Sequence, residues 1–179
     1  AGYTPTRNHI IVNELDNVRN RLYAWTPTAQ GWTRAALPGL PEFGTVVANA
    51  VDDQDSDAYF VTVTDYLTPT SLHLGEVGKG APSLLKSLPA FFDASALAVN
   101  QHEAVSADGT RVPYFLVASK DLKLDGKNPT VLYGYGGFEV SMTPSYSAGI
   151  GDSWLNKGGV YVVANIRGGG EFGKKWHRS

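Results

Sequence analysis

The sequence predicts a mixed β and α/β fold, in which a β-rich region is followed by the first part of an α/β domain. As far as residue 89, short apolar runs alternate with turn residues, a pattern typical of antiparallel meanders. Beyond that point, two apolar runs without polar alternation flank a helical stretch. Such runs are typical of buried strands joined by a crossover, with helices packed on the sheet.

Five β runs are expected in the first region, and they fit two units of roughly 40 residues. A repeat of this length is typical of four-stranded propeller blades, which stack because one blade cannot bury both of its faces. An open antiparallel sheet or a small sandwich is the alternative on the pattern alone. The expected strands cover residues 9–15, 21–25, 45–51, 58–64 and 71–74.

The segment 88–93 interrupts the meander, and we place the domain boundary there. A partial propeller is therefore expected over residues 1–90, and a partial α/β domain over residues 91–179. The second region is expected to open with a hairpin from residue 102 to 117, because Asp108-Gly109 favours a tight turn. Strands at 130–133 and 159–165 then flank a helix expected over 146–157.

A glycine-rich stretch, Tyr133-Gly134-Tyr135-Gly136-Gly137-Phe138, follows the strand expected at 130–133. In α/β-hydrolases one oxyanion donor comes from a glycine-rich loop after an early strand, and another comes from the backbone after the nucleophile. Glycine lets such a backbone pass close to a substrate because it has no Cβ. A simple sharp turn at a strand end is the alternative for an isolated Gly-Gly pair.

A second glycine-rich motif runs from residue 158 to 173 and reads GGVYVVANIRGGGEFG. Together the two motifs resemble the prolyl oligopeptidase family of serine peptidases. Residues 108–114 are similar to that family's entry into its peptidase domain, and residues 16–22 to a late propeller blade. The resemblance implies the last blades of a seven-bladed β-propeller, followed by the N-terminal part of an α/β-hydrolase domain.

The resemblance also implies roles for four residues of the first motif. Tyr135 matches the family's side-chain oxyanion donor, and Phe138 matches an aromatic residue of the pocket for the substrate's proline. Gly136 and Gly137 are expected to bring the backbone against the substrate. A phenol aimed at the developing negative oxygen stabilises the tetrahedral state more than the ground state. For both aromatic residues, a place in the core is the alternative.

The nucleophile is missing from this stretch of sequence. The family's serine lies in a Gly-Gly-Ser-Asn-Gly-Gly-type elbow, followed by an aspartate and a histidine, all C-terminal to the two motifs. Ser153 lacks the second glycine of an elbow and falls in the expected helix, so we reject it as the nucleophile. His9, His73, His102 and His177 are expected to be surface or structural residues and not catalytic ones. The chain is therefore predicted to be inactive alone.

The intact parent is expected to be a serine endopeptidase that hydrolyses short, proline-containing peptides after proline through an acyl-enzyme. Two alternatives remain: a related oligopeptidase that cleaves after basic residues, and a noncatalytic β-rich interaction module.

No cofactor and no metal are expected. The absence of cysteine excludes disulfides and thiolate sites. The acidic run at 53–57 resembles the start of a calcium loop, but Ala58 and Thr64 occupy the positions that need glycine and glutamate. Residues 168–173 satisfy a dinucleotide fingerprint, yet Glu171 has the wrong charge for phosphate. We expect Arg167 and Glu171 to hold neighbouring backbone or propeller residues instead.

A net charge of −2 gives no basic footprint for nucleic acid, and no apolar run has the length of a membrane span. The expected protein is soluble, in the cytoplasm or the periplasm, with both chain ends read as cuts. The intact parent is expected to be a monomer. The fragment is expected to self-associate or to need the missing part of its chain, because Val131 and Val162 would lie on strands that lack neighbours.

Overall fold

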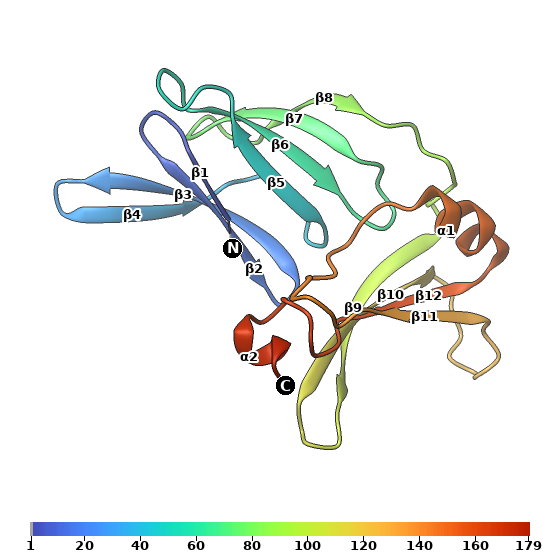
Figure 1. Cartoon of the computed structure of the whole chain (residues 1–179). Helices are drawn as coiled ribbons and strands as arrows, with labels where there is room; N and C mark the ends of the chain where they lie inside the picture. Colours follow the sequence, from blue (N-terminus) through green and yellow to red (C-terminus); the bar gives the residue numbers. More distant parts are fainter. Residues whose placement is uncertain (1) are drawn as a thin grey trace. The chain divides into compact units, whose positions relative to one another are not determined.

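The computed structural model describes residues 2–179, which divide into two compact units. Unit 1 runs as far as Asp65 and includes Pro69–Pro89, and unit 2 comprises Tyr66–Thr68 and Ala90–Ser179. The described residues are rich in β structure: twelve strands form three four-stranded sheets, and the helices between and after them are short (Figure 1). Within residues 2–179, no helix has the length and apolar character needed to cross a membrane.

Unit 1 contains two antiparallel meanders, so the expectation of two four-stranded repeats is confirmed. The first has the order β1-β2-β3-β4 and the second β5-β6-β7-β8. The strands of the first sheet are β1 (Gly2–Pro5), β2 (Ile10–Asp16), β3 (Arg19–Thr28) and β4 (Gly31–Ala36). Those of the second are β5 (Thr45–Ala50), β6 (Ala58–Thr64), β7 (Ser71–Glu76) and β8 (Ser83–Ser87).

The core of unit 1 is built from the inward-facing residues of these strands. In β3, Leu22 and Ala24 are buried two positions apart, as the pleat of a strand requires. They pack in one cluster with residues of both meanders: Ile11, Leu22, Ala24, Leu37, Val46, Ala48, Tyr59 and Val61. Strands β1, β4 and β8 were not predicted, because almost every residue in them is exposed and no apolar alternation marks them.

Polar side chains of the first meander also bind the backbone of β5. Thr4 Oγ1 donates to the Ala48 carbonyl at 2.9 Å, and Asn13 Nδ2 donates to the Val46 carbonyl at 2.7 Å. Asn20 Oδ1 accepts from the Val46 N–H at 3.2 Å. Because β5 ends its own sheet, these bonds satisfy backbone groups that would otherwise lack partners.

Unit 2 holds a mixed sheet with the order β11-β12-β10-β9. The predicted hairpin is present as the antiparallel pair β9 (Leu97–Val105) and β10 (Arg111–Ser119). Strand β12 (Val160–Ala164) pairs antiparallel with β10 and parallel with β11 (Thr130–Gly134). The parallel pair is joined by a crossover that contains α1 (Ala148–Ser153) and the 3-10 helix η1 (Leu155–Lys157). A single turn, α2 (Lys174–His177), lies near the C-terminus.

The helix expected over 146–157 is present but shorter and broken. The Ser147 hydroxyl accepts from the Ile150 N–H at 3.3 Å and caps the start of α1. Trp154 leaves the helical conformation at φ −125° and ψ −61°, so η1 begins after it. The Trp154 indole then donates to the Val160 carbonyl at 2.9 Å, which fixes the break against β12.

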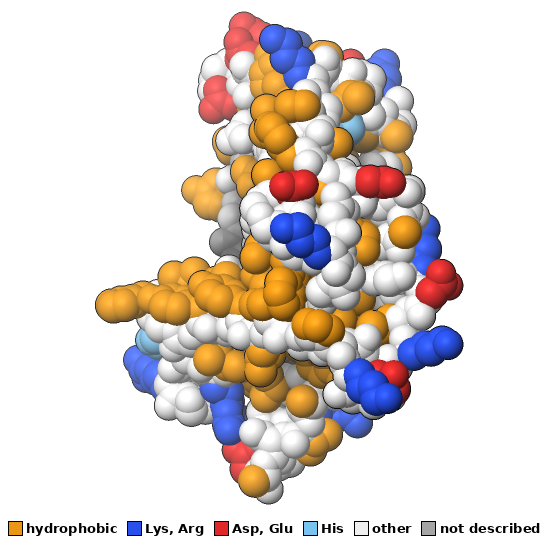
Figure 2. Space-filling view, turned by 90° about the vertical axis from the view of Figure 1, so that its right-hand side faces the viewer, with side chains coloured by type: hydrophobic (Ala, Val, Ile, Leu, Met, Phe, Trp, Pro, Cys, Tyr) orange, Lys and Arg blue, Asp and Glu red, His pale blue; other side chains and the backbone are white. Residues whose placement is uncertain are grey.

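Strand β11 differs from the expectation that it is buried on both faces. All five of its residues are exposed, because β11 lies at the edge of the sheet with β12 as its only neighbour. Val131 is thus on an edge strand as expected, but the expectation was wrong for Val162, since β12 is paired on both sides. Leu132 is 71% exposed, and Figure 2 shows apolar side chains gathered in a band across one face of the surface.

Candidate active site

The two glycine-rich motifs form loops at the same edge of the sheet in unit 2. The first glycine loop (residues 134–142) leaves the end of β11, and the second glycine loop (residues 165–173) leaves the end of β12. Because β11 and β12 are parallel, with Gly134 opposite Ala164, both loops start side by side. The carboxyl edge of parallel strands is where open α/β sheets bind their ligands.

The backbones of the two loops are in direct contact, because glycine has no side chain to hold them apart. A Cβ added to Gly168 would overlap the Gly136 carbonyl, and one added to Gly136 would overlap the Arg167 carbonyl. A Cβ added to Gly170 would overlap the Glu139 carbonyl in the same way. Gly168 also has a φ of +97°, a conformation that side chains disfavour. The glycines are therefore required for the close approach of the loops.

Tyr135 and Phe138 both reach the surface of the first glycine loop. The Tyr135 side chain lies over Gly137, where an added Cβ would be 3.0 Å from the hydroxyl oxygen, and the residue is 38% exposed. Phe138 is 89% exposed and has a φ of +55°, followed by Glu139 at +57°. A place in the core is thus wrong for both aromatic residues. Two successive left-handed residues other than glycine store strain of roughly 1–3 kcal/mol each, which is typical of ligand-binding loops.

The glycine amides of the second glycine loop are bonded within the protein and do not point at a ligand. Gly168 N–H donates to the Trp176 carbonyl at 3.0 Å, Gly170 N–H to Val140 at 3.2 Å and Gly173 N–H to Gly170 at 3.2 Å. A dinucleotide site needs such amides to point at the ligand. The interpretation of these glycines as a tight loop is therefore confirmed. Within residues 2–179, no group of three or more histidine and acidic side chains is placed to hold a metal ion.

Arg167 and Glu171 have different partners in unit 2. Glu171 accepts from the Met142 N–H at 2.9 Å, so the expectation that it holds neighbouring backbone is confirmed. The same expectation was wrong for Arg167, which pairs with the side chain of Asp108 and also donates to Ser106 Oγ at 3.2 Å. Arg167 thus ties the second glycine loop to the turn of the β9–β10 hairpin. Sequence reasoning missed this pair because 59 positions separate its members.

The carboxyl of Asp108 is expected to titrate at an unusually low pH. A hydrogen bond from the Thr110 N–H, and then the contact with Arg167, lower the pKa of Asp108 to about 2 from its ordinary 3.8. The stabilisation from this pair is therefore fully present above pH 3.8 and is lost as the pH falls through about 2. Carboxyl titration by NMR checks the value. In Arg167→Gln the pKa is expected to rise but to stay below 3.8, because the Thr110 bond remains; an unchanged pKa would contradict the pairing.

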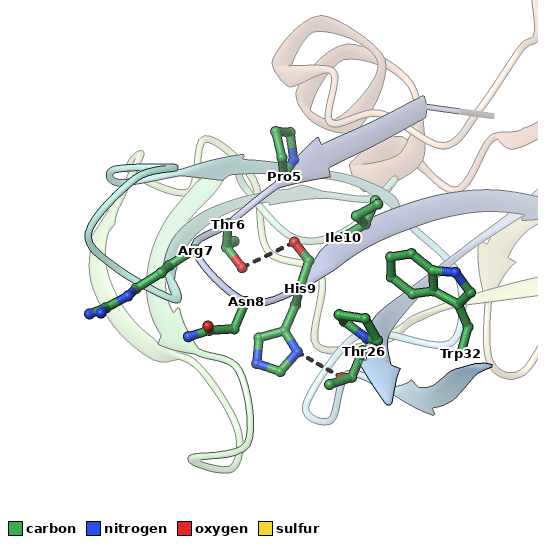
Figure 3. Close-up of a pocket in the computed structure, with 9 residues that line it drawn as sticks. Pro5, Thr6, Arg7, Asn8, His9, Ile10, Thr26 and Trp32 are labelled. Atoms are coloured by element: carbon green, nitrogen blue, oxygen red, sulfur yellow. Dashed lines mark hydrogen bonds between the residues drawn. The ribbon is translucent and has the colours of Figure 1, made fainter. Parts of the chain in front are cut away.

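A hollow of about 370 Å³ lies in unit 1, against the loop that joins β1 and β2. Figure 3 shows Trp32 on one side of it, next to Thr26, and Arg7 pointing away on the other side. His9 lies between them and forms a hydrogen bond with Thr26, with 2.7 Å between His9 Nδ1 and Thr26 Oγ1. The hollow is lined by residues 5–10 together with Thr26, Pro27 and Trp32.

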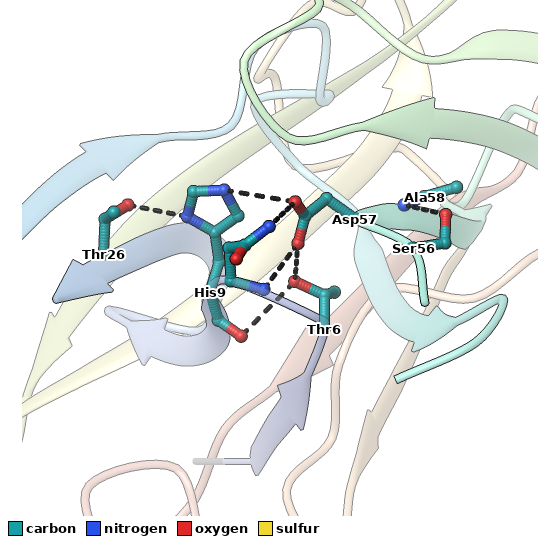
Figure 4. Close-up of polar contacts among 7 residues, drawn as sticks. Thr6, His9, Thr26, Ser56, Asp57 and Ala58 are labelled. Carbon is teal, nitrogen blue, oxygen red and sulfur yellow. Dashed lines mark hydrogen bonds and ion pairs between the residues drawn. The ribbon is translucent and has the colours of Figure 1, made fainter. Parts of the chain in front are cut away.

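His9 also approaches Asp57, and the group superficially resembles a hydroxyl, histidine and carboxylate triad (Figure 4). The distance from His9 Nε2 to Asp57 Oδ2 is 3.8 Å. The carboxylate already accepts from Thr6 Oγ1 at 2.9 Å, and from the backbone and side-chain N–H groups of Asn8 at 2.8 and 2.7 Å. Burial raises the pKa of Asp57, but these bonds and His9 outweigh it, so the net shift is downward. Asp57 therefore ties the loop between β1 and β2 to the second meander.

Replacing Asp57 with alanine is expected to lower the free energy of unfolding by about 1–3 kcal/mol, because the Asn8 and Thr6 donors lose a charged acceptor. Denaturant unfolding measures the change. Asp55→Ala is the matched control, since this exposed residue lies in the same acidic run, and a change within about 0.5 kcal/mol is expected there. Equal losses in the two variants would mean that the hydrogen bonds of Asp57 do not stabilise unit 1.

The remaining histidines and Ser153 have structural surroundings. His73 Nε2 lies 2.9 Å from Ser71 Oγ, and His177 Nδ1 lies 2.5 Å from the Gly168 carbonyl. The ring of His102 packs on Tyr114, with 5.5 Å between centroids. Ser153 is the last residue of α1, which agrees with its rejection as a nucleophile. The interpretation of the histidines as structural is confirmed by these contacts.

Comparison with known proteins gives long, continuous matches. An uncharacterized peptidase of Sinorhizobium fredii is 49% identical over 177 residues, which is 99% of this chain and 24% of the relative. A prolyl endopeptidase of Elizabethkingia miricola is 38% identical over 138 residues, or 77% of this chain and 19% of the relative. A search of protein-family models finds no match.

Solved structures give the same result. A post-proline cleaving enzyme from Rickettsia typhi superposes with a TM-score of 0.82 and 34% identity, over 100% of this chain and 26% of that one. The chain thus spans about a quarter of the length of the proteins that it matches.

Proposed function

The chain belongs to the prolyl oligopeptidase family, and on this premise we propose that it is part of a serine endopeptidase that hydrolyses short peptides after proline. In this proposal, residues 1–90 are the last blades of a seven-bladed β-propeller. Residues 91–179 are the N-terminal part of an α/β-hydrolase domain. The serine, histidine and aspartate of the catalytic triad lie in the part of the protein that follows these motifs.

The arrangement of β11, α1 and β12 supports the α/β assignment. Two adjacent parallel strands joined through a helical crossover form the repeating unit of α/β sheets. The antiparallel strands β9 and β10 on the other side of β12 form an additional hairpin at the edge of such a sheet. The exposed face of β11 is then the position at which further strands and helices of the domain pack.

The observation that carries the proposal is the position of Tyr135 at the carboxyl edge of the parallel pair. It follows β11 by one residue, its side chain is partly exposed, and it lies over glycine instead of a bulky neighbour. A phenol in this position donates a hydrogen bond to the oxyanion of an acyl-transfer intermediate. Gly136 and Gly137 let the substrate approach the backbone, and the exposed ring of Phe138 packs against the pyrrolidine of proline.

The reaction in this proposal is acyl transfer. Histidine takes the proton of the serine hydroxyl as the serine oxygen attacks the carbonyl carbon of proline, and it gives this proton to the departing amine as the peptide bond breaks. Water, activated by the same histidine, then hydrolyses the acyl-serine ester and restores the serine hydroxyl. The residues of this chain supply one side of the site: an oxyanion donor and a substrate contact. The substrate is a short, proline-containing peptide, the full-length enzyme is a monomer, and the isolated chain is inactive because it lacks the nucleophile.

Cleavage after basic residues is the nearest rival specificity. A pocket for lysine or arginine needs carboxylates, and the first glycine loop presents both the apolar ring of Phe138 and the exposed Glu139. Proline is preferred here because Phe138 provides an apolar contact and because a relative is named a prolyl endopeptidase. A noncatalytic β-rich module is the rival from another class. It has no need for a partly exposed tyrosine that lies over glycine at the carboxyl edge of the parallel pair.

Hydrolysis of two matched chromogenic peptides, one with proline and one with arginine before the scissile bond, tests the proposal. The full-length protein is expected to favour proline on the order of 10²-fold or more in kcat/KM. The isolated 179-residue chain is expected to hydrolyse neither peptide. Preference for arginine supports the basic-residue rival, no hydrolysis by the full-length protein supports the noncatalytic module, and turnover by the isolated chain contradicts the assigned inactivity.

A further inference from the structure

Two fully buried polar side chains lie where the two glycine loops meet. Glu171 is 4% exposed and Asn165 is 0% exposed, although both are residues that usually lie at the surface. Asn165 directly follows β12, and Glu171 lies within the second glycine loop. Asn165 Nδ2 donates to Glu171 Oε1 at 3.1 Å, so the two side chains act as one unit.

This pair holds the backbone of Met142 from both sides. Glu171 Oε1 accepts from the Met142 N–H at 2.9 Å, and Asn165 Nδ2 donates to the Met142 carbonyl at 2.7 Å. Met142 ends the first glycine loop, seven positions after Tyr135. The amide and the carbonyl of one residue are thus both fixed by side chains of the second glycine loop.

Further bonds connect this anchor to the residues beneath Tyr135. The Gly170 N–H donates to the Val140 carbonyl at 3.2 Å, and the Val140 N–H donates to the Gly137 carbonyl at 3.1 Å. Gly137 is the residue over which the Tyr135 ring lies. Hydrogen bonds, together with the short backbone segments between them, therefore connect the buried pair to the surface that supports the Tyr135 hydroxyl.

The energetics of Glu171 argue against a role in stability alone. Glu171 Oε2 and Asn165 Oδ1 are both buried without a hydrogen-bond partner, and within residues 2–179 no basic side chain forms an ion pair with Glu171. Burying a carboxylate without a counter-charge is unfavourable, and an apolar side chain of similar volume is often at least as stable. The need to hold the Met142 N–H in place explains why a carboxylate occupies position 171.

We infer that Glu171 and Asn165 are positioning residues, which hold Met142 and thereby fix the Tyr135 hydroxyl where the oxyanion forms. The inference rests on the proposed function, because it assigns Glu171 an effect that acts through Tyr135. Small displacements are sufficient for a measurable loss, since a shift of about 1 Å in a catalytic group can lower the rate by about 10²-fold.

The test compares two variants of Glu171 in the full-length protein. Glu171→Met keeps the volume but removes the acceptor for the Met142 N–H, and kcat is expected to fall by about 10–10²-fold with little change in KM. Glu171→Gln keeps an acceptor oxygen at the same place, so kcat is expected to stay within about twofold of the wild type. Glu76→Met, at the exposed end of β7, is the matched control and is expected to leave kcat unchanged.

A double-mutant cycle with Tyr135→Phe separates positioning from general destabilisation. If Glu171 acts through the Tyr135 hydroxyl, Glu171→Met lowers kcat by less than about twofold once that hydroxyl is absent. Equal losses in both backgrounds overturn the inference and leave the proposed function intact. If Tyr135→Phe alone keeps full kcat, the proposed role of Tyr135 fails, and the inference fails with it.

Two further measurements test the inference even if Glu171→Met does not fold. Asn165→Ala removes the donor to the Met142 carbonyl and is expected to show the same loss of kcat and the same dependence on Tyr135. Hydrogen exchange of the Met142 amide is expected to be slow in the wild type and in Glu171→Gln. Rapid exchange in Glu171→Gln, or full kcat in Asn165→Ala, overturns the inference.

Discussion

Replacing Tyr135 with phenylalanine is expected to lower kcat of the full-length peptidase by about 10²–10³-fold, with KM nearly unchanged. In the proposed function the phenol donates to negative charge that develops only in the transition state, so its loss is expected to weaken transition-state binding and to leave substrate binding almost intact. The ring itself remains, and with it the contact with Gly137, so the free energy of unfolding is expected to change little. Steady-state kinetics on a proline-containing chromogenic peptide measures both constants.

Tyr3→Phe is the matched control for this variant. Tyr3 is 77% exposed on β1 of unit 1, and removal of its hydroxyl is expected to leave kcat and KM unchanged. A rise in KM at constant kcat in Tyr135→Phe would assign Tyr135 to substrate binding instead of oxyanion stabilisation.

Replacing Gly168 with alanine is expected to lower the free energy of unfolding by about 2–6 kcal/mol. The φ of +97° is unfavourable for alanine, which contributes roughly 1–3 kcal/mol. The new Cβ also overlaps the Gly136 carbonyl, and forcing a close-packed contact apart typically costs about 1–3 kcal/mol more. Because the obstructing atom belongs to the backbone, no side-chain rotation relieves the overlap. Thermal or denaturant unfolding measures the loss.

Gly158→Ala separates the two causes. Gly158 ends η1 at a similar φ of +84°, but an added Cβ would meet nothing within 4 Å. This variant is expected to lose about 1 kcal/mol from backbone strain alone. If Gly168→Ala loses no more than Gly158→Ala, the two glycine loops do not pack as closely as the structure has them.

Much of the fold follows from local patterns in the sequence. The alternation of apolar residues predicts β2, β3, β5, β6 and β7, and the Asp108-Gly109 step predicts the β9–β10 hairpin. Strands without a buried face leave no such signal, which is why β1, β4 and β8 were missed. The apolar character of β11 predicts burial, but burial depends on what packs against a strand, and β11 lies exposed at the edge of its sheet.

The two glycine-rich motifs of the candidate site were predicted from the sequence, but the contact between them was not predicted. Spacing in the sequence does not show that Gly136 and Gly168 meet, because no side chain marks the contact. The pairing of Arg167 with Asp108 was not predicted either, because nothing in the sequence pattern distinguishes these two residues from the other charged residues. The sequence also gives no sign that Glu171 is buried, since glutamate is normally an exposed residue.

The backbone contact between the glycine loops limits how the site can change by mutation. Most packing defects can be repaired by a second substitution that shrinks the opposing side chain, but here the opposing group at Gly168 is the carbonyl of another glycine. No smaller residue exists, so compensating substitutions across this contact are not available. In a saturation library, Gly136, Gly168 and Gly170 are therefore expected to tolerate no replacement and to have no second-site suppressors in the facing loop.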